Sequence, residues 1–416
     1  MSFILLILYL FCTFIRPQDW IPELERLRLV NFISLATIFS LYIERIGSKK
    51  GGFVNAPQSR LMIGLFISIL LSQLAHTYIE GAKEAFSSFL IIFILYFIIL
   101  NAINTETKFK IAIGFMVFFI FLLVFQGMYQ LEYGYGWAGQ RPIFQNNSMR
   151  ITWVGIFNDP NDLALIFVMA VSISIALFFG RSNYFMRLLA IPVIGFFCYG
   201  IFLTNSRGGM LALMASILYY FVKKTRKFMI GGIIGGLFIA LIIVLGPSRL
   251  GLISIEEDSA YGRVNLWYEG ILLLKSNPVF GVGYNMFMED LPQTAHNSYL
   301  LAAAELGMLG LFFWMSLIYI SMKGLTLVQE TDAKLKDYAL GLQSALIGFC
   351  VAAFFLSRTY VIIPYMLFAL SGSLIYIVRN KNPGLEFKFT LQDAKRSLGL
   401  GILSLVLVYA IIKLGL

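Results

Sequence analysis

Long, uninterrupted apolar runs recur along this sequence, and they restrict its possible folds more than any other feature. Short joints rich in Lys and Arg separate the runs, and only 13% of all residues are charged, against roughly 25% in a soluble domain. Backbone polar groups in a lipid bilayer need partners inside the protein, so a spanning segment is a helix or a barrel strand. The runs do not alternate with a period of two, as barrel strands do. The sequence therefore predicts an all-α, polytopic membrane protein.

The apolar runs predict about 12–13 transmembrane helices. The first run is short for a full span, so a re-entrant or interfacial helix is an alternative there. The spans form one membrane domain, residues 1–416, with an outer loop at 130–160 and a large outer loop at 247–297. The predicted spans cover residues 3–15, 29–45, 61–78, 85–103, 109–129, 161–180, 187–204, 208–223, 228–246, 298–321, 338–356, 360–378 and 397–415.

Lys and Arg gather in alternate joints, and the positive-inside rule uses this asymmetry to orient the spans. The joint from Lys223 to Lys227 is strongly basic and is assigned to the cytoplasmic side. Counting outward then places the joint at His76 and residues 130–160, 204–209, 247–297 and 357–360 on the opposite side. The net charge of +10 follows largely from this topology, so no nucleic-acid partner is expected. The other inner joints contain Arg45, Lys49, Lys50, Arg60, Lys108, Lys110, Arg181, Arg187, Lys323, Lys334, Lys336, Arg379, Lys381, Lys388, Lys395 and Arg396.

The three cysteines, Cys12, Cys198 and Cys350, all lie within apolar runs. Their positions favour neither a disulfide framework nor a metal site. The N-terminal run lacks both a basic leading segment and a small-residue cleavage site, so we expect a retained span, not a signal peptide.

Arginines on the outer side need an explanation, because topology does not require positive charge there. Arg207 stands between two spans, either at the tip of a tight hairpin that reaches lipid headgroups or as a clamp for an anion. Arg263 begins a segment, 262–275, whose apolar spacing predicts an amphipathic helix on the membrane surface or against neighbouring spans. Arg358 lies on the same side. Two or three arginines together would match the charge of a pyrophosphate without a metal ion.

His296 directly precedes a predicted span and is one of only two histidines. It is either an interfacial residue at a helix entry, where Asn297 or Ser298 supplies the cap, or a general base. An imidazole with a pKa near 6.5 accepts a proton from an attacking hydroxyl near neutral pH. His76 has no comparable motif around it and is expected to be interfacial.

The sequence NDPND at 158–162 predicts a helix start, with Asp159 as N-cap, Pro160 at the first position and Asp162 at the third. Capping alone explains these residues. The additional interpretation is that a helix N-terminus on the outer face, including Asn161, binds anions or sugar hydroxyls. The aromatic residues of the 130–160 segment form either an interfacial belt or a platform for sugar rings.

Four blocks together resemble the O-antigen ligase and O-antigen polymerase (Wzy-type) superfamily of bacterial membrane glycosyltransferases. They cover the second half of the chain, and their order, spacing and shared side make the combination fairly specific. The first half matches only in being hydrophobic. The blocks are FNDPNDLA at 157–164, TNSRGGMLAL at 204–213, GRVNLWYEGILLLKSNPVFGVGYNMF at 262–287 and AHNSYLLAAAELGMLGLFFW at 295–314.

The resemblance implies a GT-C-like fold in the bacterial inner membrane, with a periplasmic loop domain that carries short amphipathic helices. It implies inverting transfer of a glycan from an undecaprenyl-pyrophosphate carrier to an acceptor hydroxyl at the periplasmic face, without a metal or other cofactor. Arg207 and Arg263 would hold the pyrophosphate, and His296 would be the catalytic base. The candidate supporting residues are Asp159, Asn161, Asn297 and Arg358.

Several alternatives stay open at this point. The resemblance does not separate a ligase from a polymerase, and the acceptor is a growing glycan, lipid A core or a protein. Membrane lipids are the remaining expected partners. A polytopic transporter of a small anion is the rival from another class. Transporters bury charges near the bilayer midplane, whereas here the predicted spans are nearly free of charge, with Glu305 as the nearest exception.

Overall fold

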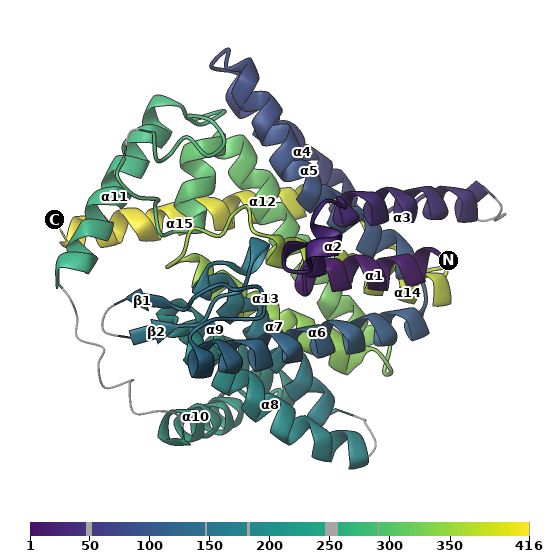
Figure 1. Cartoon of the computed structure of the whole chain (residues 1–416). Coiled ribbons are helices and arrows are strands. Elements are labelled where there is room, and N and C mark those ends of the chain that lie inside the picture. Colours follow the sequence, from purple (N-terminus) through teal and green to yellow (C-terminus); the bar gives the residue numbers. More distant parts are fainter. Residues whose placement is uncertain (47–51, 146–147, 181–183, 246–256, 290, 416) are drawn as a thin grey trace.

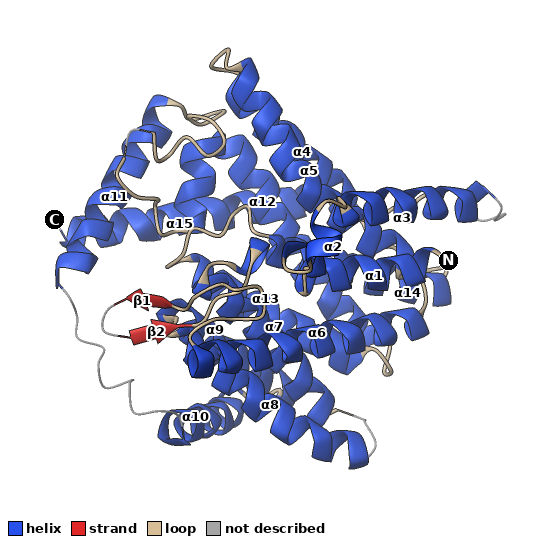
Figure 2. Cartoon of the chain, in the orientation of Figure 1, coloured by secondary structure: helices blue, strands red, loops and turns tan. Residues whose placement is uncertain are grey.

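Helices make up nearly all of the described chain, as the apolar runs predict (Figures 1 and 2). The structure, a computed structural model, describes residues 1–46, 52–145, 148–180, 184–245, 257–289 and 291–415. In these ranges the elements are α1 (Ser2–Phe14), η1 (Pro17–Asp19), α2 (Pro22–Glu25), α3 (Leu29–Ile46), α4 (Pro57–Leu74), α5 (Ile79–Ala102), α6 (Glu106–Tyr133), β1 (Ile143–Gln145), β2 (Ser148–Arg150), η2 (Gly155–Phe157), α7 (Pro160–Phe178), α8 (Tyr184–Thr204), α9 (Arg207–Thr225), α10 (Phe228–Leu245), α11 (Glu257–Ser276), α12 (Ser298–Thr331), α13 (Lys336–Ala353), α14 (Ile362–Lys381) and α15 (Leu391–Gly415).

A helix lies at every position where an apolar run predicts a span. By length and hydropathy, however, eight of the described helices qualify as membrane spans, and the segments 190–204 and 228–242 are shorter apolar helices. The predicted number of about 12–13 is therefore larger than the number that meets this criterion. Polar and charged residues lower the hydropathy of some of the others: α9, for example, starts at Arg207 and ends with Lys223 and Lys224 in its last turn. The chain is a multi-pass, all-α membrane protein.

Helix α13 contacts two sets of packed helices. Helix α7 contacts α8, α9 and α13, while α12 contacts α4, α13, α14 and α15. Because 83% of the apolar window of α7 is buried but only 22% of that of α15, α7 is a central helix and α15 turns most of its surface outward. Exposed apolar side chains on α15, such as Leu403 and Val406, suit contact with lipid.

The molecule has two chemically different ends. At one end Lys224 Nζ lies 3.0 Å from Asp337 Oδ1 and joins α9 to α13, and Lys381 Nζ lies 2.6 Å from Glu106 Oε2 and joins α14 to α6. The opposite ends of α7, α9, α12 and α14 meet around the polar cluster described below. In Figure 1 the hairpin β1–β2, α11 and the C-terminus lie at the left, and the N-terminus and the far end of α3 lie at the right.

Some sequence-based assignments fall outside the described residues. They are the inner-side assignments of Lys49, Lys50 and Arg181, and the first part, residues 247–256, of the large outer loop. The rest of that loop contains α11 and the turns that lead into α12. Helix α11 has 20 residues and is one longer helix where short ones were predicted.

Helix α12 is interrupted at Gly307, which has a φ of +67° and a ψ of −171°. The segment after α11 fills the break: Val282 N donates to Ala304 O at 2.9 Å, and Met308 N donates to Pro278 O at 2.9 Å. A Cβ on Gly307 would lie 2.2 Å from Val279 O, so only glycine permits this close approach. The sequence predicts one continuous span over 298–321, and the break is visible only in the tertiary structure.

Candidate active site

The start of α7 contributes a capped helix end. Asp159 is the N-cap, and its Oδ1 accepts hydrogen bonds from the Asn161 backbone N at 2.7 Å and Asn161 Nδ2 at 2.9 Å. Pro160 occupies the first helical position and Asp162 the third. The structure confirms the predicted cap: Asp159 accepts from a backbone donor that a helix start leaves unpaired, and Pro160 has no such donor.

Arg358 reaches this helix start from the turn between α13 and α14, 199 residues away from Asp159 in sequence. Its Nη2 donates to Asp159 Oδ2, and its Nε lies 2.7 Å from Asp162 Oδ1. The Ser298 hydroxyl oxygen also accepts a 2.7 Å hydrogen bond from the Arg358 backbone N. Because two carboxylates already neutralise this guanidinium, Arg358 holds the ends of α7, α12 and α14 together.

Arg150 on β2 is a further arginine at the site, and sequence reasoning did not select it. Its Nε donates to Thr204 O at 2.9 Å and its Nη2 donates to Asn161 Oδ1 at 3.2 Å. Burial lowers the pKa of Arg150, the charge of Arg358 lowers it further, and Asp159 opposes both. No motif surrounds Arg150 in sequence. The only available signal was its position on the outer side, which it shares with Arg207.

The start of α9 packs directly on the start of α7. Ser206 is the N-cap of α9: its Oγ accepts from Gly209 N at 3.0 Å and donates to Asn161 Oδ1 at 2.7 Å. A Cβ on Gly209 would lie 2.5 Å from Ala164 Cβ, so the glycine allows the two helices to approach closely. Arg207, the first residue of α9, is exposed, and its side chain makes no hydrogen bond or ion pair with any described residue.

Arg263 approaches Arg207 from α11. Burial lowers the pKa of the half-buried Arg263 guanidinium, and the nearby charge of Arg207 lowers it further. Within the described ranges the Arg263 side chain has no hydrogen-bond acceptor and no carboxylate partner. The two guanidinium groups are therefore close enough to repel each other, and no described carboxylate neutralises either of them.

Helix α11 presents one apolar face to α12 and α15, and this face explains the predicted spacing. Trp267 and Ile271 are buried together with Leu300 of α12 and Ile412 of α15. Trp267 Nε1 also donates a 2.8 Å hydrogen bond to Ala295 O. The helix that carries Arg263 is thereby bonded to the residue next to His296.

His296 lies at the entry to α12 in a left-handed backbone conformation, with a φ of +49°. The next residue, Asn297, caps the helix by accepting from Tyr299 N and Leu300 N, both at 3.0 Å. The imidazole itself has no hydrogen-bond partner among the described residues. A non-glycine residue with positive φ is strained, and such strain persists only where surrounding contacts over-determine it. At this position the Asn297 cap and the Trp267 bond supply such contacts.

The electrostatic surroundings of His296 connect the whole cluster. Burial lowers the pKa of His296, the positive charges of Arg263 and Arg358 lower it further, and Asp159 opposes them. The imidazole is therefore neutral near pH 7. The tertiary structure thus brings Arg207, Arg263, His296, Arg358 and Asp159 into one electrostatic neighbourhood at one end of the molecule.

The remaining candidates have structural contacts. His76 lies apart from the cluster, with its Nε2 2.8 Å from Gly281 O in the loop that fills the α12 break. Glu305 is buried just before that break, and its Oε1 accepts a 3.2 Å hydrogen bond from Phe287 N. No group of three or more His, Cys, Asp or Glu side chains suited to a metal ion occurs in the described parts of the chain.

Comparison with known families adds independent information. Residues 192–315 match a family model described as O-antigen ligase. The matched segment contains Arg207, Arg263 and His296, whereas Asp159 and Arg358 lie outside it. No curated protein sequence matches the chain significantly. This match implies a lipid-linked glycan as substrate. The chain is a multi-span membrane protein that contains a segment of the O-antigen ligase family, residues 192–315.

Proposed function

We propose that this protein transfers a glycan from an undecaprenyl-pyrophosphate carrier to an acceptor hydroxyl, with inversion at the anomeric carbon. In this reaction the acceptor oxygen attacks the anomeric carbon, the bond from that carbon to the pyrophosphate breaks, and the acceptor proton moves to His296. The observation that carries the proposal is that two guanidinium groups, which no described carboxylate neutralises, share one electrostatic neighbourhood with the imidazole of His296.

Arg207 and Arg263 are the proposed pyrophosphate ligands. Both lack a carboxylate partner within the described residues, and each lies in the electric field of the other. Bringing like charges together is unfavourable, so an anion that sits between them relieves repulsion as well as forming charge-assisted hydrogen bonds. As the glycosyl bond breaks, further negative charge develops on the leaving pyrophosphate, and guanidinium groups fixed beforehand stabilise it.

His296 is the proposed general base. Its lowered pKa keeps the imidazole unprotonated near neutral pH, which is the state that accepts a proton. Arg358, bound by Asp159 and Asp162, supports the site by fixing the turn against Ser298, two residues after His296. Asn161 links Arg150 to Ser206, and Asn297 fixes the start of α12.

We also propose that the site faces the periplasm from the bacterial inner membrane. Support comes from the distribution of basic residues: Lys224 and Lys381 belong to the end of the bundle opposite the candidate site. Lys and Arg in short joints favour the cytoplasmic side. Arg207 and Arg263 at the other end, which have no ion pair with a described residue, then bind the substrate and are not needed for the topology.

Two acceptor classes fit this chemistry. A ligase would use a hydroxyl on lipid A core or on a protein, and a polymerase would use a hydroxyl of the growing glycan. The same arginines and histidine serve both. A transporter is less well supported, because Glu305, the charged residue within a span that favoured it, is bonded to the Phe287 backbone beside the break in α12.

The test is transfer by purified protein given a lipid-linked oligosaccharide and an acceptor glycan. Relative to the wild type, we expect a loss of about 10²–10⁴-fold for His296→Ala and about 10²–10³-fold for Arg207→Ala and Arg263→Ala. Arg28→Ala, which removes an exposed arginine outside the cluster, is the matched control and retains activity. Wild-type transfer by both Arg207→Ala and His296→Ala would refute the assignment of roles.

A further inference from the structure

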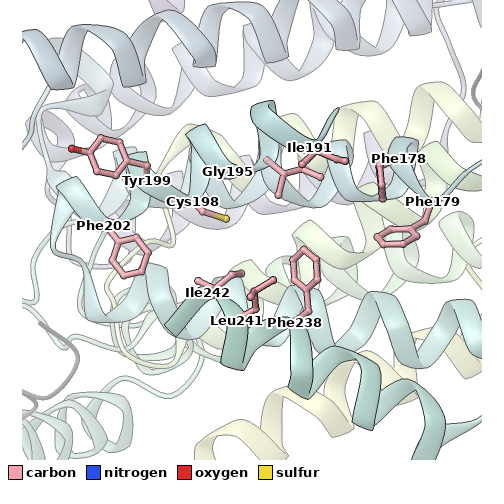
Figure 3. Close-up of a pocket in the computed structure, with 11 residues that line it drawn as sticks. Phe178, Phe179, Ile191, Gly195, Cys198, Tyr199, Phe202, Phe238, Leu241 and Ile242 are labelled. Carbon is pink, nitrogen blue, oxygen red and sulfur yellow. The ribbon is translucent and has the colours of Figure 1, made fainter. Parts of the chain in front are cut away.

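An apolar slot lies between α8 and α10, and neither proposed pyrophosphate ligand nor His296 lines it. It has a volume of about 340 Å³, and its lining contains no charged side chain. Figure 3 shows Gly195 and Cys198 of α8 opposite Phe238 and Ile242 of α10. Neither Arg207 nor Arg263 lines the slot.

The length of the slot matches one leaflet of a bilayer. Its lining on α8 extends from Ile191 to Phe202. These two residues are eleven positions apart, which corresponds to roughly 16 Å along an α-helix. The hydrocarbon core of a bilayer is about 30 Å thick, so one leaflet contributes about 15 Å. An acyl chain that lies along α8 and α10 therefore fits the slot without crossing the membrane.

One end of the slot meets a basic pocket. Phe179, at the end of α7, lines both the slot and a second cavity of about 580 Å³. The second cavity belongs to the lysine-rich end of the molecule, because Lys224 and Asp337, the ion pair that joins α9 to α13, both line it. The apolar slot therefore ends beside a polar cavity at the end of the bundle opposite His296.

The charge of the basic pocket suits a phosphate group. Four basic side chains line it, against two acidic ones, Glu330 and Asp337. The basic residues come from three helices and a helix C-cap, and they are Arg187, Lys224, Arg226 and Lys336.

Two of these basic groups are available to a ligand. Lys224 is paired with Asp337 at 3.0 Å, and Arg187 Nη2 donates to Gly180 O at 2.7 Å. Arg226 and Lys336 have no ion pair or side-chain hydrogen bond with any described residue. The positive-inside rule explains basic residues at this end, but it does not require them to line one cavity that adjoins an apolar slot.

We propose that the slot and the basic pocket together bind one anionic phospholipid. An acyl chain lies in the slot between α8 and α10, and the phosphate lies in the pocket near Arg226 and Lys336. The tail of the glycan carrier is the rival occupant. The charge argues against it, because the slot shares Phe179 with the basic pocket, whereas no arginine of the transfer site lines the slot. This site is separate from the proposed transfer chemistry, so either proposal can fail alone.

The test uses the full-length protein, purified in detergent and delipidated. Phosphatidylglycerol, phosphatidylethanolamine or undecaprenyl phosphate is added, and the Tm and the lipid retained in native mass spectrometry are measured. Because a ligand that binds only the folded state raises the Tm, we expect phosphatidylglycerol to raise it by several degrees. Phosphatidylethanolamine, which has no net charge, is expected to give less than half that shift.

Two kinds of variant test the two halves of the site. Gly195→Leu fills the slot, since a Cβ at Gly195 meets no atom within 4 Å, and leucine also favours the helix. Its matched control is Gly236→Leu on α10, where a Cβ likewise meets no atom within 4 Å but which does not line the slot. The double variant Arg226→Gln, Lys336→Gln removes the two available charges.

We expect Gly195→Leu to abolish the shift caused by phosphatidylglycerol, the double variant to reduce it at least fivefold, and Gly236→Leu to retain it. An unchanged shift in both Gly195→Leu and the double variant would overturn the proposal. A second result would also overturn it: undecaprenyl phosphate gives the larger rise in Tm, and this rise is lost in Gly195→Leu but kept in the double variant. In that case the slot holds the tail of the glycan carrier. Transfer activity in the same preparations reports separately on the proposed function.

Discussion

The imidazole of His296 lies among positive charges, and this has a consequence for its protonation during the reaction. Burial and the charges of Arg263 and Arg358 lower the pKa of His296 in the free protein. A bound pyrophosphate would add negative charge beside Arg263 and offset part of that effect. Donor binding is therefore expected to raise the pKa of the same imidazole, which makes it a stronger base when the substrate is present.

We therefore expect kcat/KM and kcat to fall at two different pH values on acidification. Loss of kcat/KM on acidification should occur below the ordinary histidine value of about 6.5, because kcat/KM reports the free enzyme. Loss of kcat, which reports the complex, should occur at higher pH. Arg263→Gln should raise the pH at which kcat/KM falls, because it removes one of the charges that lower the pKa of His296. Rate profiles between about pH 5 and 9 measure both limbs. If kcat and kcat/KM fell at the same pH, and did so also in His296→Ala, His296 would not be the general base.

Removing the Arg358 side chain should destabilise the fold more than removing the Arg207 side chain. Arg358→Ala leaves Asp159 and Asp162 without their cation, and breaking a buried pair in this way costs roughly 3 kcal/mol or more. The partly exposed Asp159 reduces that figure, because solvent screens it. Arg207→Ala removes no side-chain hydrogen bond or ion pair to a described residue, so we expect thermal stability within about 0.5 kcal/mol of the wild type. Thermal unfolding in detergent compares them, and equal stability of the two variants would argue against the bracing role of Arg358.

At the scale of elements, the break in α12 determines how the outer loop packs. The loop after α11 donates and accepts backbone hydrogen bonds across the gap at Gly307, and Glu305 O accepts from Gly283 N at 3.0 Å. Irregular backbone is tolerated at membrane depth only where protein buries it and satisfies its polar groups. The break in α12 therefore depends on this loop. The loop in turn can approach so closely only because Gly307 has no Cβ.

Gly307→Ala should accordingly destabilise the fold. The substitution forces a Cβ to within 2.2 Å of Val279 O and imposes a positive φ on alanine, which costs about 1–3 kcal/mol for the conformation alone. Gly399→Ala on α15 is the matched control, because a Cβ there meets no atom within 4 Å, and it should be neutral or slightly stabilising. Thermal unfolding of the two variants decides the matter, and equal stability would show that the break is not required.

The bond between α11 and the His296 loop gives a second prediction at this scale. Trp267→Phe keeps an aromatic ring but removes the donor to Ala295 O, and it should lower kcat at least tenfold by loosening His296. Trp153→Phe is the control, because Trp153 is equally buried and donates to Phe14 O over the same 2.8 Å, away from His296. Each should lose about 1 kcal/mol of stability. A similar kcat in both variants would leave Trp267 with a structural role only.

At the scale of the whole molecule, the sidedness of the site can be measured directly. In a variant whose native cysteines are replaced by alanine, Gln293→Cys places an exposed thiol beside the candidate site, and Lys395→Cys places one at the start of α15. A membrane-impermeant maleimide should label residue 293 in cells with a permeable outer membrane, and residue 395 only after the inner membrane is opened. The reverse pattern would place the site on the cytoplasmic side.

The sequence alone determined the features that depend on near neighbours in the chain. Hydropathy over about 20 residues fixed where helices lie, so a helix occupies each predicted position. Local capping chemistry predicted the start of α7 through Asp159 and the start of α12 through Asn297 or Ser298, of which Asn297 is the cap in the structure. The helical spacing of Trp267 and Ile271 fixed the buried face of α11. Each of these depends on interactions within a few residues, which a sequence pattern records.

The tertiary structure alone decided which arginines meet a carboxylate among the described residues and which do not. Arg358 meets Asp159 across 199 residues of chain, and Arg150 reaches Asn161 only because the β1–β2 hairpin folds over the start of α7. Arg207 and Arg263 approach each other from different helices. Neutralisation depends on distance in space, and a charge carries no local pattern that names its distant partner. For the same reason the gap at Gly307 and the lysine-rich pocket beside Phe179 appeared only once the helices were packed.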